Sequence, residues 1–331
     1  MAERPKLVLA MRPDIVDLVL PAPVRARLDT LAEVTAGPLT DWSGATGELA
    51  AAELLLTGWG CPPLDTAFLA RAPRLAAVIH AAGTVKGHVG PEVWERGIAV
   101  SSAADANAAP VIEFTLATVW LAARHTLGAA AAYRTGHYPG YRERQGADGA
   151  VVGVIGASRI GRGVIARLRA APAGFHILLA DPYVSAAEAD TLGVELVDLD
   201  ALCRRADIVS VHAPDLPETH HLLNARRLAL LQDGAAVINT ARGRLVDTDA
   251  LAAECATGRL DAYLDVTDPE PLPPTHPLRA LPNVLITPHI AGCQGTEVQR
   301  LGAYAVDEVE RWIKGEALLG TIRAEELTRI A

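Results

Sequence analysis

The sequence contains few of the residues that mark disulfide-rich or zinc-binding proteins. Its four cysteines are far apart and form no CxxC pair; they are Cys61, Cys203, Cys255 and Cys293. This spacing indicates neither a cysteine zinc site nor a disulfide framework, so we expect the thiols to be reduced and buried. We assign no metal to the chain from its sequence.

Positive charge is also scarce, since 30 Lys and Arg stand against 39 Asp and Glu, a formal net charge of -9. Nucleic acids and anionic membrane surfaces are bound by clustered Lys and Arg, so neither is an expected partner. Arg12 and Asp14 interrupt the first apolar run, and no uncharged stretch approaches the length of a membrane span. We expect a cytoplasmic protein, in which an anionic ligand needs local cations.

The chain of 331 residues is long enough for two domains, and half of its residues are apolar. In the first part, short apolar runs alternate with helical patterns, which is typical of a parallel sheet covered on both faces. The expected strands are residues 6–10, 53–57, 76–80 and 98–101, and the expected helices are residues 21–31, 66–72 and 91–96.

A glycine turn is the main feature of the second part. Val151–Ile155 is short, apolar and largely β-branched, and a four-residue apolar spacing follows it, so a strand passes into a helix here. In a dinucleotide-binding fold Gly156 makes the tight turn and Gly161 lets the helix and strand pack closely. The free amides at the start of the helix then face a pyrophosphate.

Two other residues bear on this turn. Ser158 stands where the fingerprint has its second glycine, so the backbone approaches the phosphates less freely. Asp181 ends the next apolar run and can accept hydrogen bonds from an adenosine ribose. No Lys or Arg follows as far as Asp190, so a 2′-phosphate would meet an uncompensated carboxylate, which favours NAD over NADP. The alternative is an ordinary βαβ turn that binds nothing.

Five more apolar runs complete a six-stranded, doubly wound dinucleotide-binding sheet. We expect Asn107 to cap a helix that begins near Pro110, and residues 136–149 to form a surface connection. Thr296 and Gln299 predict a capping box for a last helix that ends at Gly315 and packs on the first domain. The further strands are residues 176–180, 208–212, 236–239, 262–265 and 284–287.

The expected fold class is therefore α/β with two domains. Residues 104–292 form a Rossmann domain for NAD, built on a doubly wound parallel sheet. Residues 1–103 and 293–331 form a smaller, discontinuous, flavodoxin-like α/β substrate domain.

Three polar side chains follow predicted strands of the second sheet: Arg242, Glu270 and His289. The carboxyl ends of the strands are where cofactor and substrate meet in such a sheet, so these side chains are candidates for one site. Taken singly, each fits an ordinary loop, turn or half-buried residue. Together with the glycine turn and Asp181, the combination resembles the D-isomer-specific 2-hydroxyacid dehydrogenase family from Leu54 through the terminal helix.

The resemblance implies a role for each of the three. His289 is the acid/base, because imidazole titrates near neutral pH. Glu270 orients the ring and favours its protonated form. Arg242 binds the substrate, since its planar fork of donors can hold a carboxylate while polarising the adjacent carbonyl.

The resemblance also implies the cofactor site. Asp265 touches the nicotinamide amide, Arg159 and Ile160 donate to the pyrophosphate, and Thr240 and Ala241 line the cofactor. The full expected set is Gly156, Ser158, Arg159, Ile160, Gly161, Asp181, His212, Ala213, Thr240, Ala241, Asp265 and Gly292.

The substrate loop departs from the family pattern. It lacks the common Gly-Val-Asp-Asn run and reads Thr84-Val-Lys-Gly-His-Val89. The lysine followed by glycine in this loop resembles the corresponding loop of phosphite dehydrogenase, a member of the same family. Lys86 either contacts the anionic end of the substrate or is a solvated loop residue. The expected substrate residues are Trp59, Thr84, Val85, Lys86 and Gly87.

We therefore expect an NAD-dependent 2-hydroxyacid dehydrogenase that interconverts a small 2-oxo acid and its D-2-hydroxy acid. Relatives commonly dimerise through the nucleotide domain, so a homodimer is expected. Two alternatives stay open: oxidation of a phosphite- or phosphonate-type anion on the same fold, and a non-catalytic protein that senses NAD, as the family's corepressor relatives do.

Overall fold

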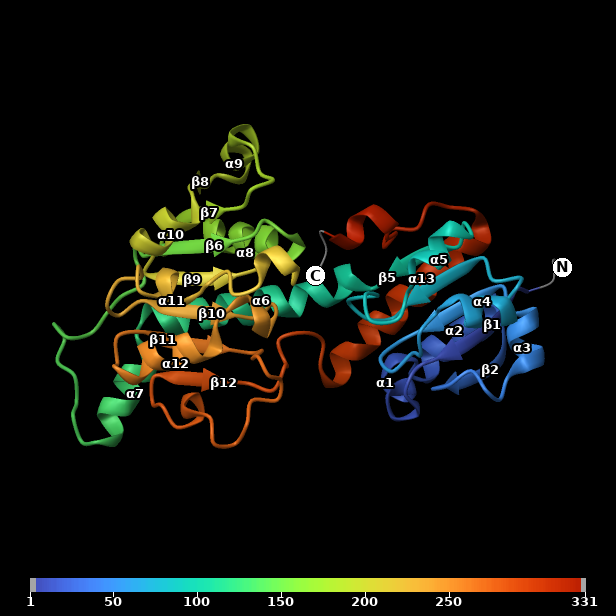
Figure 1. Ribbon diagram of the computed structural model, residues 1–331, viewed down its shortest axis with the longest axis horizontal. Coiled ribbons are helices and arrows are strands. Elements are labelled where there is room, and N and C mark those ends of the chain that lie inside the picture. Colours follow the sequence, from blue (N-terminus) through green and yellow to red (C-terminus); the bar gives the residue numbers. More distant parts are fainter. Residues whose placement is uncertain (1–3, 329–331) are drawn as a thin grey trace. The chain divides into compact units, whose positions relative to one another are not determined.

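The structure is a computed structural model that describes residues 4–328 (Figure 1). Within that range the chain divides into two compact units, one running to Ala108 and resuming at Cys293, the other spanning Ala109–Gly292. Each unit contains one sheet whose strand pairings are all parallel. The α/β class is thus confirmed, while the assignment of domains to functions at 103/104 and 292/293 stays a prediction.

The first unit has a five-stranded sheet in the order β2-β1-β3-β4-β5, which is the flavodoxin-like order. Along β3, Leu54 and Leu56 enter one apolar cluster with the last helix, and Leu55 enters another with α4. Both faces are covered, which explains why these strands read as unbroken apolar runs. The strands are β1 Lys6–Ala10, β2 Glu33–Leu39, β3 Leu54–Thr57, β4 Ala77–His80 and β5 Ala99–Ser102.

The helices of this unit are short apart from two. They are α1 Val16–Val19, α2 Ala22–Leu31, α3 Thr46–Ala51, α4 Thr66–Arg71, α5 Pro91–Glu95 and α13 Val298–Lys314, with 3-10 turns η1 Pro13–Ile15, η5 Gly295–Glu297 and η6 Ala324–Thr328. Sequence reasoning missed β2 and α3. β2 is a partly exposed edge strand that contains Gly37 and Pro38, so it shows no strand pattern.

The second unit has a seven-stranded sheet in the order β12-β11-β10-β9-β6-β7-β8. Counted within the unit this is the Rossmann order 3-2-1-4-5-6 with one more edge strand. The missed strand, β8, has only two residues and so gives no periodic signal. The strands are β6 Val151–Ile155, β7 His176–Ala180, β8 Glu195–Leu196, β9 Ile208–Val211, β10 Ala236–Asn239, β11 Asp261–Leu264 and β12 Val284–Ile286.

Helices cover both faces of this sheet, on which two separate apolar clusters are buried. The connection 136–149 runs over the surface as expected, with Tyr138 and Tyr141 largely exposed. The helices are α6 Ala104–Ala123, α7 Thr126–Arg134, α8 Arg159–Ala170, α9 Ala186–Leu192, α10 Leu199–Arg205, α11 Ala225–Leu228 and α12 Thr248–Ala256, with η2 Pro217–Thr219, η3 Gly243–Leu245 and η4 Pro277–Arg279.

The predicted start of α6 was wrong. The helix begins at Ala104, Pro110 lies inside it, and Asn107 does not cap it. Pro110 has no amide proton for the carbonyl of Ala106, four residues earlier. That carbonyl instead faces the thiol of Cys293 at 3.7 Å, and Asn107 Oδ1 accepts from the Cys293 amide at 3.0 Å. A contact distant in sequence thus permits the helix to run through the proline.

By length and mean hydropathy, 1.3, α6 is also apolar enough to cross a membrane. The sequence argument considered uncharged stretches only, and α6 carries Asp105 and Glu113. Its second half packs into a cluster of the second sheet through Val119 and Ala122. This is the pattern of a core helix.

The last helix, α13, ends as predicted, with Gly315 at φ 70° after Lys314. Its predicted capping box was wrong, because a 3-10 turn precedes it and Glu297 accepts from the amide of Gln294 at 3.3 Å. The helix packs on α1, α2 and β4, which confirms its expected place in the first unit. Gly302 is required there, since a Cβ would lie 1.6 Å from Val19 O.

The four cysteines are unpaired. Cys203, Cys255 and Cys293 are buried as predicted, whereas Cys61 is only half-buried, on the loop after β3. Burial raises the pKa of the Cys203 thiol to about 11 and that of Cys255 to about 12, so both remain protonated near neutral pH.

Candidate active site

The glycine turn after β6 lies where the strand order reverses, beside the end of β9. Gly156 has φ 94°, and a Cβ there would lie 2.8 Å from Ala213 N. A Cβ at Gly161 would lie 2.1 Å from Gly156 O. The first glycine is therefore required by backbone conformation and by close approach, and the second by helix–strand packing.

Ser158 is the N-cap of α8, and its Oγ accepts from the amide of Gly161 at 3.3 Å. Asp181 accepts from Ala157 N at 2.7 Å through one oxygen and from Tyr183 N at 2.8 Å through the other. Both side chains thus shape the turn itself, which the sequence did not indicate. Each carboxylate oxygen of Asp181 still has a lone pair for a second donor.

A cation that the sequence argument missed lies beside the same turn. Arg162 donates through Nε to Ala157 O at 2.7 Å and pairs with Glu188 at 2.7 Å. The argument searched only residues after Asp181, whereas Arg162 comes from the first turn of α8. Its charge is compensated by Glu188, the acidic residue opposite. Of the other fingerprint residues, Arg159 is exposed and Ile160 is half-buried.

His212 directly follows β9 and is only 3% exposed. Its Nε2 lies 2.8 Å from Ser210 Oγ, and its Nδ1 has no hydrogen-bond partner among the described residues. Burial lowers the pKa of His212 to about 3, so the ring is neutral near pH 7. The next residue, Ala213, packs against Gly156, so His212 and Ala213 both line the glycine turn.

Arg242 follows β10 on a loop fixed by Asn239. The amide of Asn239 donates to Arg242 O at 2.8 Å, and its Oδ1 accepts from Ala241 N at 3.1 Å. Gly243 lets this loop touch the next one, since a Cβ there would lie 2.0 Å from Thr267 O. Thr240 is bonded to Thr115 of α6 through their hydroxyls at 2.8 Å.

Glu270 and His289 meet directly, with His289 Nδ1 2.7 Å from Glu270 Oε1. Both side chains are about half exposed, at 52% for His289 and 43% for Glu270. Burial lowers the pKa of the Arg242 guanidinium, and the nearby charges of Asp215 and Glu270 oppose that shift. The three polar side chains singled out from the sequence therefore lie together in the second unit.

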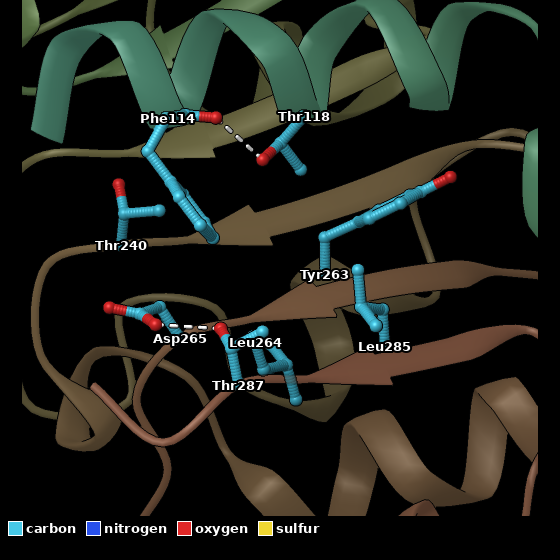
Figure 2. A pocket seen from close by; sticks show the side chains of 8 residues that line it. All are labelled: Phe114, Thr118, Thr240, Tyr263, Leu264, Asp265, Leu285 and Thr287. Carbon is cyan, nitrogen blue, oxygen red and sulfur yellow. Dashed lines mark hydrogen bonds between the residues drawn. The ribbon is translucent and has the colours of Figure 1, made fainter. Parts of the chain in front are cut away.

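Asp265 positions the segment that carries His289. Asp265 is 3% exposed, and its carboxylate accepts from Thr287 Oγ1 at 2.6 Å, Ile290 N at 2.8 Å and Ala291 N at 2.8 Å. Gly292 comes directly after Ala291 in this segment. Figure 2 shows Asp265 and Thr287 joined at one side of a small pocket, with α6 above it. The pocket is lined by Phe114, Thr118, Thr240, Tyr263, Leu264, Asp265, Leu285 and Thr287.

The five predicted substrate residues all lie in the first unit. Lys86 and Thr84 are half-buried, Gly87 is exposed and Trp59 is 39% exposed. Val85 is fully buried in the core, so only its backbone is available to a ligand.

Two buried histidines support this loop, and the sequence did not reveal them. His80 Nδ1 lies 2.8 Å from Thr57 Oγ1, and the rings of His80 and His88 are 4.5 Å apart. Burial lowers the pKa of His80 to about 3 and that of His88 to about 4. Both imidazole rings are therefore neutral near pH 7 and are packed beneath the substrate loop.

Comparison with known proteins agrees with this geometry. Residues 116–291 match the family model described as the NAD binding domain of D-isomer specific 2-hydroxyacid dehydrogenases. The glyoxylate reductase of Thermofilum pendens is 32% identical over 96% of both chains. The chain belongs to the D-isomer specific 2-hydroxyacid dehydrogenase family.

Members of this family are oxidoreductases that use a nicotinamide dinucleotide, and the residues that match the NAD binding domain model, 116–291, lie within the seven-stranded unit. A Xanthobacter autotrophicus Py2 family member, solved in complex with NADPH and MES, is 28% identical with a TM-score of 0.77, over 98% of this chain and 99% of that one. The D-3-phosphoglycerate dehydrogenase of Methanocaldococcus jannaschii is 37% identical over 67% of this chain, which spans only 42% of that relative's length.

A nicotinamide dinucleotide fits the residues present. The glycine turn leaves no room for a Cβ at Gly156 or Gly161, and the start of α8 presents backbone amides beside it. Asp181 lies at the end of β7, as expected for a residue that receives a ribose.

Proposed function

We propose that this protein is an NAD-dependent dehydrogenase that interconverts a small 2-oxo acid and its D-2-hydroxy acid. The observation that carries the proposal is the 2.7 Å contact between His289 and Glu270, with the cation of Arg242 near it. In the reductive direction, a nicotinamide held beside Thr240, Ala241 and Asp265 would supply a hydride to the carbonyl carbon. The other half of the reaction, delivery of one proton to the carbonyl oxygen, falls to the protein.

His289 is the proposed proton donor. Since Nδ1 faces Glu270, Nε2 is the nitrogen that gives the proton to the developing alkoxide, and that takes it back during oxidation. Glu270 holds the ring and stabilises the imidazolium. Arg242 binds the carboxylate and polarises the carbonyl through its fork of donors. His289 and Glu270 are half exposed, so a substrate can reach them.

The proposed cofactor is NAD in preference to NADP. Asp181 supports this because a 2′-phosphate placed near a carboxylate is repelled, and Glu188 already compensates the charge of Arg162. The remaining proposed contacts are the amides at the start of α8 with the pyrophosphate, and Thr240, Ala241 and Asp265 with the nicotinamide half.

For the substrate, we propose a small 2-oxo acid such as glyoxylate. A relative matched over 96% of its own length is a glyoxylate reductase, and Lys86 supplies the substrate loop with a cation. Lys86, Thr84, Gly87, Trp59 and the backbone of Val85 are the proposed substrate contacts of the first unit.

We further propose a cytoplasmic homodimer. The four cysteines are unpaired, as in a reducing compartment. Three exposed tyrosines, Tyr133, Tyr138 and Tyr141, lie at α7 and the following connection of the NAD-binding domain. Exposed aromatic side chains are enriched at protein interfaces, so this segment is the proposed contact with a second copy.

A substrate panel tests the proposal. NADH oxidation is followed with glyoxylate, pyruvate, bulkier 2-oxo acids and 2-oxo diacids, and NAD reduction with phosphite, for the wild type and for Lys86→Met and His289→Ala. We expect turnover of a 2-oxo acid, its near-complete loss in His289→Ala, and a lower kcat/KM in Lys86→Met. Turnover of phosphite alone would contradict the proposed substrate class and favour a phosphite-type anion.

Tight NADH binding without any turnover would contradict the proposed activity and favour an NAD-sensing protein. An unchanged kcat/KM in Lys86→Met would make Lys86 a surface lysine.

A further inference from the structure

Three potential metal ligands meet beside the candidate active site. A nitrogen of His220, a nitrogen of His221 and a carboxylate oxygen of Asp268 all lie within 4.8 Å of one another. We propose that these three side chains bind one divalent transition-metal ion of the zinc class. Two imidazoles and a carboxylate are ligands that such ions prefer, and water completes the coordination.

The backbone places the two adjacent histidines on one side. Successive side chains of an extended chain point to opposite sides, so neighbouring residues do not ordinarily converge. His221 has φ 49°, in the left-handed region, and its ring stacks on that of His220 with centroids 3.9 Å apart. Its amide is bonded to Arg244 O at 2.8 Å, which fixes this conformation.

None of the three side chains is engaged in a hydrogen bond with another described residue. His220 is exposed, and among the described residues its ring is stacked on that of His221; Asp268 is half-buried. His221 Nδ1 lies 3.7 Å from Asp247 Oδ2, beyond hydrogen-bond distance. The three groups are thus available to a shared ligand.

Asp247 lies 3.7 Å from Nδ1 of His221, where its carboxylate would support a bound histidine once the ring turns toward it. A carboxylate behind a ligating imidazole fixes its tautomer and orientation. Asp247 is itself held in place, since its Oδ1 caps α12 by accepting from Ala250 N at 3.0 Å. We assign the coordination to Nε2 of His221, because Nδ1 is the ring nitrogen that faces Asp247.

Binding requires only a small rearrangement. Ligand atoms around a zinc-class ion at about 2.1 Å lie roughly 3.4 Å apart, and stacked rings do not direct both lone pairs at one point. The rings must rotate about χ2. His220 is exposed, so its ring can turn without disturbing the core.

The ion would connect the two loops of the candidate active site. Asp268 precedes Glu270 by two residues, and the His221 amide is bonded to the loop of Arg242 and Arg244. Gly243 already packs against Asp268, because a Cβ there would lie 2.7 Å from Asp268 N. The ion therefore stabilises this part of the folded domain, and the inference does not depend on the proposed reaction.

The test uses untagged, full-length protein treated with EDTA and exchanged into metal-free buffer. Zn²⁺ is titrated by calorimetry, and Co²⁺ by its visible ligand-field absorption. We expect one ion per chain and a rise in the Tm with Zn²⁺. His220→Ala and Asp268→Asn should lose the site, and Asp247→Asn should weaken it about tenfold. His176→Ala, an exposed histidine at the start of β7, is the matched control and should bind as the wild type does.

Two results would overturn the inference: no stoichiometric ion in the wild type, or equal binding in the wild type and in both ligand variants. His220 is exposed, so His220→Ala should keep the metal-free Tm of the wild type. If a single variant fails to fold, the loss of Zn²⁺ binding is measured instead on the double variant His220→Gln/His221→Gln, which keeps polar side chains at both positions. Unchanged Zn²⁺ binding by that variant would equally remove the site.

Discussion

His289 Nδ1 lies 2.7 Å from Glu270 Oε1, while the backbone of His289 is held at φ 55° by a bond from its amide to Asp265 O. The first contact occupies one ring nitrogen, and the second fixes the direction of the whole residue. A non-glycine residue rarely adopts this conformation, so the surrounding loop must impose it. Nε2 is thereby the ring nitrogen that remains for a substrate.

The first prediction concerns the charge of Glu270. Glu270→Gln keeps a side chain of the same shape but cannot stabilise an imidazolium. We expect kcat to fall by about 10² to 10⁴, as when general acid–base catalysis is impaired, with the KM for NADH unchanged. Steady-state kinetics measure both. Equal kcat values for the wild type and the variant would show that Glu270 takes no part in proton transfer.

The second prediction concerns the fork geometry of Arg242. Arg242→Lys keeps the charge but loses the paired donors, at a cost of about 1.5–3 kcal/mol, so kcat/KM should fall roughly 10- to 100-fold. Arg244→Lys, an exposed residue two positions along the same loop, is the control and should retain activity. If both variants keep the wild-type kcat/KM, Arg242 does not bind the substrate.

Much of the fold was predictable because buried parallel strands carry an unbroken apolar signal. β4 and β10, buried at every position, were placed within one residue. The signal failed where tertiary contacts decide the structure. The edge strand β2 contains Gly37 and Pro38, and α6 runs through Pro110 because Cys293 serves the freed carbonyl. No local pattern encodes that contact.

The candidate site was predictable at its chain positions and less so in its contacts. Arg242, Glu270 and His289 each follow a strand, and the parallel sheet brings such positions to one edge. No local pattern indicated that Ser158 caps α8, because capping depends on where the helix begins. Nor could any such pattern place His80 beside His88, since the convergence of two buried rings is set by packing.

The third prediction concerns the charge of Asp181. The wild type should prefer NADH to NADPH in kcat/KM. Asp181→Asn retains an acceptor for Ala157 N but removes the charge, so the preference should fall about tenfold, equivalent to 1.4 kcal/mol. Glu188→Gln is the companion variant, since it releases the cation of Arg162. Comparable kcat/KM for both cofactors in the wild type would contradict the role of Asp181.

The fourth prediction is a loss of stability in acid. Burial lowers the pKa of His80 and His212 to about 3, against 6.5 when unfolded, so the unfolded chain binds more protons below pH 6.5. The free energy of unfolding therefore falls with pH in the window from about 6.5 to 3. At pH 5 the loss is about 2 kcal/mol for each such histidine.

Urea denaturation between pH 7.5 and 5 measures this loss. His88 adds to it, with a pKa lowered to about 4. His212→Asn should reduce the pH dependence, whereas His176→Asn, at an exposed position, should leave it unchanged. A free energy of unfolding that is flat across this range would show that the three rings are not held neutral in the folded state.

The last prediction separates the two roles of Ser158. Its Oγ accepts from Gly161 N at 3.3 Å as the N-cap of α8, and its backbone lies in the turn proposed to hold a pyrophosphate. Ser158→Ala removes the cap and should cost about 1 kcal/mol, whereas Ser158→Gly should cost only a few tenths. The loss in Ser158→Ala corresponds to a Tm lower by about 2–4 °C.

Cofactor binding should respond differently to the two variants. Ser158→Gly restores the fingerprint glycine, lets the phosphates approach more closely, and should lower the KM for NADH. Thermal unfolding and NADH titration of the three proteins give both readings. Equal Tm values for the wild type and Ser158→Ala would show that the N-cap does not stabilise the protein. A KM unchanged in Ser158→Gly would show that the Ser158 side chain does not limit the approach of the cofactor.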